Sequence, residues 1–243
     1  MDRLVDQLRE NLAVLCRTLP SITAHKRVET HATRGIIWQN STSEGNVRVM
    51  RATGGGALDE TNQMTVFNGK PLAPGVQKGP FQPSAAFIHL QFLFFRHLDR
   101  ACLSFTMVPQ SSASAPIELY VALSPEFDSL PNCKRQLSLS DQGDPTGLTG
   151  IVRVDPATHQ ATHIERTMPA SGGNNEPFFS TDYAPVKIGE KTFWLPTETD
   201  SLAIMNKAKV HTIVHYSDYH LFTASSTILP GTPEADAPQA PTQ

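Results

Sequence analysis

The sequence predicts an α+β protein built on a strongly curved antiparallel β-sheet, a half-barrel of about 9–11 strands with two helices on its concave side. Three observations predict this fold. A leucine stripe near the start is typical of an amphipathic helix, residues 84–98 form a long apolar segment, and short strands follow one another with tight turns from residue 150 onward. No helical pattern interrupts this last run, which indicates an antiparallel meander.

The first predicted element is a helix over residues 2–19. Leu4, Leu8, Leu12 and Leu15 recur at helical spacing and leave the charged residues on the opposite face. Pro20 ends the pattern, because proline cannot continue a helix. We expect this helix to lie on a sheet.

Two strands follow in the first third of the chain. Valines alternate with polar residues over residues 45–53, and residues 62–70 form a second strand that ends at Asn68-Gly69, a strong hairpin-turn signal. Residues 23–33 alternate only loosely, and residues 71–83 are proline-rich and read as a loop.

The most apolar stretch is SAAFIHLQFLFFRHL, residues 84–98. Its length favours a helix, although Ile88, Leu90, Phe92 and Phe94 also alternate as in a strand. Its phenylalanines cannot all point the same way on a helix. We therefore expect a plug or lid that is buried on several sides or covers an apolar ligand.

The remaining strands are expected at residues 101–108, 117–124 and then five or six times between residues 150 and 229. The whole of residues 1–229 is predicted to form one domain, since a chain of 243 residues lies within the range of one large β-rich domain. The Pro/Ala-rich tail, residues 230–243, is expected to be disordered.

Composition excludes several classes of function. The formal charge of −3 and the lack of a basic cluster exclude nucleic-acid binding by electrostatics. No apolar run reaches the roughly 18 residues that a transmembrane span needs. The start, MDRLVDQLRE, lacks the apolar region of a signal peptide. Taken literally the chain is cytoplasmic; if an export signal is missing from it, the periplasm or cell envelope is expected instead.

The three cysteines also bear on whether the protein is cytoplasmic or exported. Cys16, Cys102 and Cys133 show no CxxC spacing, which disfavours a zinc site or a thioredoxin-type motif. In an exported chain Cys102 and Cys133 would form a disulfide bond, whereas in a reducing compartment all three would remain buried thiols.

No motif for catalysis, a metal or a cofactor is found: a P-loop, G-x-S-x-G and HExxH are all absent. His211 and His215 lie four residues apart, which on a strand is about 13 Å and too far to share a metal. A hydrolase with a site built from His211, His215, Asp218 or His220 is the alternative function. Trp194 is a candidate for the lining of a ligand pocket, although a strand tryptophan is more often part of the core or a cross-strand anchor.

The C-terminal half resembles a bacterial envelope protein family that is similar to the lipoprotein-sorting fold of periplasmic lipoprotein carriers and outer-membrane lipoprotein receptors. The resemblance covers roughly 80 residues. The matching positions are Val152 to Pro156, Ile164-Glu165, Asp182-Tyr183, Pro185, Gly189, Phe193 to Pro196, Tyr216 and Tyr219. It implies a curved half-barrel that helices plug, and the transfer of acyl chains without bond chemistry. No lipobox cysteine and no arginine equivalent to a carrier's switching residue is found here.

We therefore expect a non-enzymatic binding protein of the cell envelope that holds a lipid, a lipoprotein acyl chain or another apolar small molecule, or a protein partner, in its concave sheet. An interaction module that pairs through a sheet edge is a further alternative. The predicted apolar lining comprises Phe87, Phe92, Phe94, Phe105, Leu119, Val121, Val152, Val154, Ile164, Phe193, Trp194 and Val214. A one-residue error in strand parity would turn a side chain outward.

Overall fold

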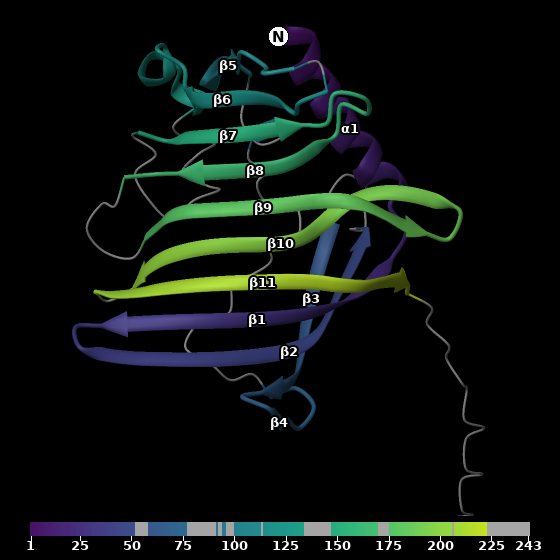
Figure 1. Cartoon of the computed structure of the whole chain (residues 1–243), viewed down its shortest axis with the longest axis vertical. Helices are drawn as coiled ribbons and strands as arrows, with labels where there is room; N and C mark the ends of the chain where they lie inside the picture. Colours follow the sequence, from purple (N-terminus) through teal and green to yellow (C-terminus); the bar gives the residue numbers. More distant parts are fainter. Residues whose placement is uncertain are drawn as a thin grey trace, which may run out of the picture.

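A single antiparallel sheet of 11 strands dominates the computed structural model of the chain (Figure 1). The structure describes residues 1–51, 58–76, 91, 94–95, 100–112, 114–133, 147–169, 175–205 and 207–222. Its helices and strands are α1 (Asp2–Thr18), β1 (Ile22–Arg34), β2 (Ile37–Arg51), β3 (Leu58–Phe67), β4 (Lys70–Pro71), η2 (Arg100–Cys102), β5 (Leu103–Val108), β6 (Ile117–Leu123), η3 (Phe127–Ser129), β7 (Thr149–Val154), β8 (Ala161–Thr167), β9 (Asn175–Ile188), β10 (Lys191–Met205) and β11 (Ala208–Leu221).

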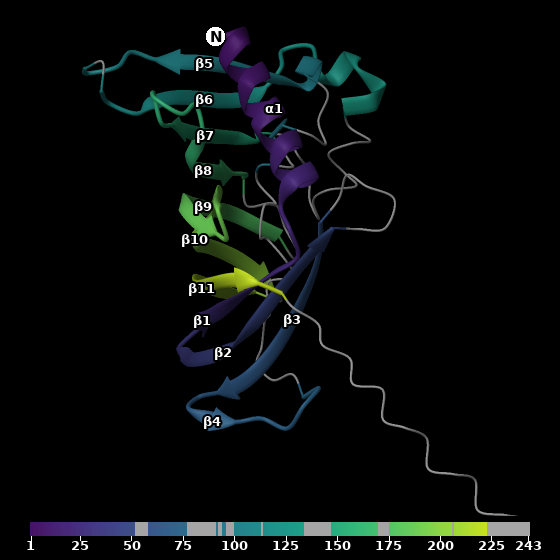
Figure 2. The same cartoon turned by 90° about the vertical axis from the view of Figure 1, so that its right-hand side faces the viewer.

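The strands are ordered β4-β3-β2-β1-β11-β10-β9-β8-β7-β6-β5. Every adjacent pair is antiparallel, and the sheet is curled but not closed, so that β4 and β5 form its two edges (Figure 2). The antiparallel meander and the strand number that the sequence predicts are confirmed. The Asn68-Gly69 turn between β3 and β4 is confirmed as well, with positive φ angles of 48° and 72°.

One long hydrogen-bonded joint holds two sets of strands together. β1, the first strand, pairs with β11 from Ile22↔Leu221 to Thr33↔Lys209. β1 to β4 extend the sheet on one side of this joint and β5 to β11 on the other. Residues 23–33, which alternate loosely in sequence, thus form the centre of the sheet.

Helix α1 confirms the predicted leucine stripe. Val5, Leu8, Leu12 and Leu15 are buried, and the helix ends at Thr18, before Pro20. The helix runs across the right-hand ends of the strands in Figure 1, from β5 toward β10, and the chain then enters β1. The apolar core lies between this helix and the sheet, and it includes residues of every strand from β5 to β11 and of β1 and β2.

The prediction of two helices on the concave side is found only in part. α1 is present, but residues 84–98 fall mostly outside the described residues. Of that segment, Gln91, Phe94 and Phe95 are described; they have helical backbone and are buried. That both helices lie on the concave side stays a prediction, and the expected tail, residues 230–243, also lies outside the described residues.

A disulfide bond links Cys102 to Cys133, the pairing expected of an exported chain. Both cysteines are buried, with 0% and 1% of their surface exposed. The bond ties the start of the edge strand β5 to the segment after η3. Cys16 is a buried residue of α1.

Candidate functional site

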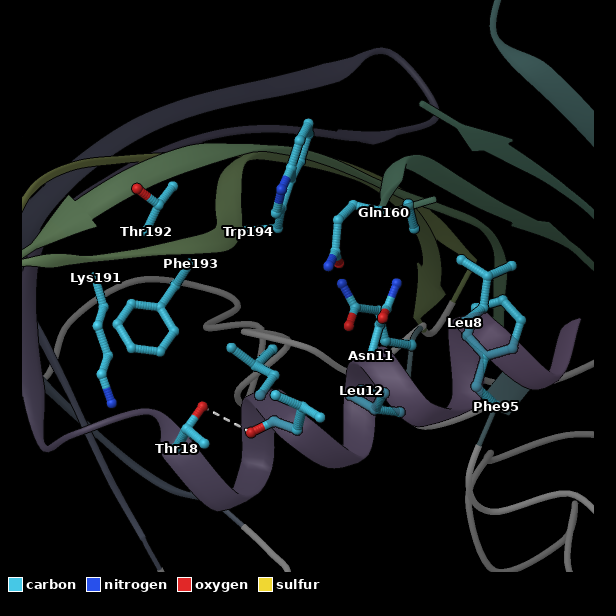
Figure 3. A pocket seen from close by; sticks show the side chains of 14 residues that line it. Leu8, Asn11, Leu12, Thr18, Phe95, Gln160, Lys191, Thr192, Phe193 and Trp194 are labelled. Atoms are coloured by element: carbon cyan, nitrogen blue, oxygen red, sulfur yellow. Dashed lines mark hydrogen bonds between the residues drawn. The ribbon is translucent and has the colours of Figure 1, made fainter. Parts of the chain in front are cut away.

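A pocket of about 390 Å³ lies between α1 and the sheet (Figure 3). Three parts of the chain line it: the sheet-facing side of α1, the first four residues of β10, and the turn between β7 and β8. Gln91 and Phe95 complete the lining. Its volume is within the range of small-molecule sites in proteins, which is roughly 300–1,000 Å³.

The helix supplies the apolar side of the pocket. Leu8, Leu12 and Leu15 point to the sheet because residues spaced by three and four share one helix face. Val14 and Thr18 lie nearer the opening, where Val14 is 42% exposed. The Thr18 hydroxyl donates a hydrogen bond of 2.8 Å to the carbonyl of Val14.

The β9–β10 hairpin supplies the opposite side. Its tight turn starts at Gly189, whose φ of 62° suits glycine, and Lys191 to Trp194 then line the pocket one after another. Phe193 is buried and Trp194 half-buried against the core. Adjacent strand residues normally point to opposite faces, so this end of the hairpin must bend toward α1 for all of them to reach one pocket.

The β7–β8 turn closes the third side and is fixed to the helix. The Oδ1 atom of Asp155 accepts hydrogen bonds from the Thr158 hydroxyl and from the N–H groups of Thr158 and Ala157. These bonds, the Thr158 hydroxyl first, hold the pKa of Asp155 below its ordinary value. The Asn11 side chain then donates a 2.7 Å hydrogen bond to the His159 carbonyl, which places Gln160 at the pocket.

The lining indicates which chemistry the pocket would accept. Leucines, phenylalanines and Trp194 form its walls, while Asn11, Gln160 and Lys191 supply polar groups (Figure 3). Of the described residues that line it, none is acidic and Lys191 is the cation. The arrangement suits a molecule with an apolar body and a neutral or anionic polar end.

The predicted lining residues are distributed differently from the expectation. Phe193 and Trp194 line the pocket, and Trp194 also packs against the core. Phe87 and Phe92 lie outside the described residues. The others are buried in the packed core: Phe94, Phe105, Leu119, Val121, Val152, Val154, Ile164 and Val214. A ligand would reach them only if the core opened, so their role stays a prediction.

Sequence reasoning missed most of the helix and turn contribution. Asn11, Gln160 and Lys191 line the pocket without belonging to any recognisable motif. Two signals were available: the apolar segment of residues 84–98, which contains Phe95, and the stripe of Leu8, Leu12 and Leu15, which marks the sheet-facing side of α1. What lies opposite that stripe depends on tertiary packing.

The centre of the buried face is more polar than expected of an apolar trough. Lys26, Thr30, Thr199 and Thr212 are all buried on β1, β10 and β11. The Lys26 ammonium donates a 2.9 Å hydrogen bond to Asn62 and lies 4.0 Å from the Glu60 carboxylate. Burial lowers the pKa of Lys26, and Glu60 offsets part of that shift.

The histidines of the hydrolase alternative form separate pairs. His211 lies 2.6 Å from Asp200, and His215 lies 3.1 Å from Glu198. His220 contacts the Thr23 hydroxyl and the Asp218 carbonyl. None of these side chains lines the α1–β10 pocket. The structure does not gather them around a common hollow.

One of these pairs, His215 with Glu198, belongs to a row of charged residues that crosses the sheet in register. Ion pairs within it join His215 to Glu198, His163 to Asp182 and Arg153 to Glu118. The row comprises Glu44, Arg27, His215, Glu198, Asp182, His163, Arg153 and Glu118, one from each strand between β2 and β6.

Within the described ranges, no three His, Cys, Asp or Glu side chains are placed to hold a metal ion together. A search of the same residues for a membrane-crossing helix, one both long and apolar, finds none.

Comparison with known proteins gives structural matches only. No protein-family model and no curated protein sequence matches the chain significantly. Solved structures do match over most of the chain. A LolA superfamily protein from Nitrosomonas europaea has a TM-score of 0.36 and 9% identity, with 91% of this chain and 94% of that chain covered.

Two further structures are similar in the same way. A protein domain from Vibrio parahaemolyticus, described as outer-membrane lipoprotein-sorting, has a TM-score of 0.39 and 10% identity over 91% of this chain and 92% of its own. A DUF1329 family protein from Desulfovibrio piger has a TM-score of 0.37 and 10% identity over 91% and 95%. The resemblance to lipoprotein-sorting proteins is found again among solved structures.

Proposed function

We propose that this protein is a non-enzymatic binding protein that holds a single-chain lipid, such as a fatty acid, in the pocket between α1 and β10. The observation that carries the proposal is the pocket itself, about 390 Å³ in volume, with leucine, phenylalanine and tryptophan walls. Each methylene buried there contributes roughly 0.8 kcal/mol, so an acyl chain needs no elaborate set of polar contacts.

The charge of the lining supports an anionic head group. Lys191 lies at the pocket next to Thr192, while the described lining residues include no carboxylate that would repel a carboxylate ligand. An ammonium group pairs with a carboxylate through a charge-assisted hydrogen bond. We therefore expect fatty acids to bind more tightly than the matching alcohols or methyl esters.

The location that we propose is the cell envelope. The buried Cys102–Cys133 disulfide bond supports it, because such bonds persist in oxidising compartments. A carrier or sensor of acyl chains in the periplasm would need neither a metal nor a catalytic group.

The first test is native mass spectrometry of protein purified without detergent, followed by titration with palmitate. We expect bound acyl species in the native mass and a melting temperature that rises with palmitate concentration. A clean ligand-free mass together with an unchanged melting temperature would contradict the proposal.

A pocket-filling variant gives the matched control. Val14→Trp places a large ring at the pocket opening from an exposed position of α1, so we expect palmitate affinity to fall by about tenfold or more with little loss of stability. Arg3→Trp adds the same ring to an exposed position of the same helix, away from the lining. Equal affinities for the two variants would exclude the α1–β10 pocket as the site.

A further inference from the structure

The tip of the β1–β2 hairpin exposes a compact group of large apolar side chains. Ile36 is 95% exposed, Ile37 68% and Trp38 76%, and we refer to these three residues as the apolar tip. Ile36 is the second residue of the two-residue turn between Arg34 and Ile37, and Ile37 and Trp38 are the first two residues of β2. The tip lies at the left of Figure 1, and α1 lies at the opposite ends of the strands.

The fold does not need apolar residues at this turn. Gly35 supplies the positive φ, 60°, that a hairpin turn with glycine at its first position requires. The β9–β10 hairpin has the same arrangement, with Gly189 at a φ of 62°, and there the next residue is the exposed Glu190. A polar residue thus fits the position that Ile36 occupies, and turns generally favour polar residues.

The surroundings of the apolar tip are cationic. Residues 30–43 and 201–211 contain no aspartate or glutamate. The β10–β11 turn lies beside the tip, since Thr33 of β1 pairs with Lys209 of β11 (Figure 1). Arg34, Lys207 and Lys209 are all exposed at this end of the sheet.

We propose that the apolar tip inserts into the interfacial region of an anionic phospholipid bilayer, with Arg34, Lys207 and Lys209 contacting the head groups. Tryptophan favours this region, since the indole ring has an apolar body and a polar N–H group, and the two isoleucines add apolar surface that the bilayer would bury. Basic residues beside inserted side chains add attraction to anionic lipids. The site lies at the other end of the strands from the α1–β10 pocket and does not depend on the proposed ligand.

The size and shape of the tip favour a bilayer over a protein partner. A stable protein interface buries about 800 Å² on each partner, through roughly 20–30 residues. The apolar tip is one turn that projects from the end of the sheet, whereas a bilayer can receive a few side chains without a complementary surface.

The test is flotation of the intact protein with vesicles of phosphatidylcholine alone and of phosphatidylcholine with about 30% phosphatidylglycerol, an anionic lipid that attracts basic residues. We expect binding to the anionic vesicles and at least about tenfold weaker binding of the Ile36→Ser/Trp38→Ser variant. Lys207→Gln/Lys209→Gln should also weaken binding, and 0.5 M salt should have a similar effect because it screens the attraction.

The matched control is Tyr120→Ser, which removes a 44% exposed aromatic residue from β6, and it should bind like the original protein. Val14→Trp, which fills the pocket, should also bind vesicles normally, so the two proposals fail independently. Absence of vesicle binding, or binding unaffected by Ile36→Ser/Trp38→Ser, would overturn the inference. A concentration-dependent dimer that this variant abolishes, without vesicle binding, would instead assign the tip to self-association and would also overturn it.

Discussion

At position 45 the sheet leaves no room for a side chain. A Cβ atom on Gly45 would lie 2.0 Å from the carbonyl oxygen of Gln63 and 2.8 Å from the Cα of Met64 on β3. The register between β2 and β3 shifts at this point, between Glu44 and Gly45. Glycine is therefore required by the close approach of two backbones rather than by its own φ angle.

We predict that Gly45→Ala destabilises the protein by about 1–3 kcal/mol, because one of the two strands must move to relieve the overlap. Chemical denaturation measures the change in the free energy of unfolding. Ser43→Ala, two residues away on the same strand, is the control and should change it by much less. An equally small change in the free energy of unfolding for the two variants would contradict the need for glycine at position 45.

The direction in which individual side chains face could be predicted from the sequence only in part. Phe193 and Trp194 could be identified as large apolar residues of a strand, but period-two alternation puts them on opposite faces. Both line the pocket because the β9–β10 hairpin bends toward α1. Lys26 and Thr30 are polar but buried. The apolar pattern of β1 is therefore loose in the sequence, although burial along the strand alternates regularly. Such outcomes depend on neighbours that are distant in sequence.

Among the elements, those with strong local signals could be predicted. α1 follows from its leucine spacing and Pro20, and β7 to β11 follow from short alternating runs between turns. The order of strands beyond each hairpin could not be predicted, because the β1–β11 pairing joins segments from the two ends of the chain. The pocket depends on the same long-range arrangement, since α1, β10 and the β7–β8 turn meet only in the folded molecule.

The disulfide bond stabilises one element in particular, the edge strand β5, and its contribution to the free energy of unfolding can be measured. Cys102 and Cys133 are 31 positions apart, and a cross-link over such a loop contributes about 3–4 kcal/mol in the loop-entropy model. We predict that Cys102→Ser/Cys133→Ser loses about this amount in chemical denaturation.

Amide hydrogen exchange shows whether loss of the disulfide bond loosens only the β5 edge or the whole sheet. Because the bond anchors the start of β5, amides of β5 and β6 should exchange faster in the double serine variant than amides of β1 and β11. Uniform acceleration across the sheet would contradict a local role. Cys16→Ser is the control for the loss of a buried sulfur.

The whole molecule should lose stability in alkali. Burial raises the pKa of Tyr183, Tyr216 and Tyr219 above the ordinary tyrosine value. In the unfolded chain these hydroxyls lose their protons near pH 10, whereas the folded protein retains them. Their contribution to stability is complete below about pH 10 and is lost as the pH rises further. Lys26 acts with the opposite sign, since its lowered pKa makes stability rise with pH up to about 10.4.

Equilibrium unfolding between about pH 8 and 11.5 measures this dependence. Tyr183→Phe should reduce the loss of stability above pH 10 because it removes one titrating hydroxyl. The original protein gives the reference slope. An identical slope for Tyr183→Phe would rule out ionisation of this buried tyrosine as a cause.

The pairing of β1 with β11 also affects the order of events during synthesis. A ribosome that has released only the first two hundred residues has produced β1 without the strand that completes one of its edges. Until β11 emerges, β1 and β10 each present an open backbone edge to any neighbouring chain. The nascent protein should therefore need a chaperone that shields such edges late in translation, and translation stalled just before residue 208 should give aggregates rather than a smaller folded product.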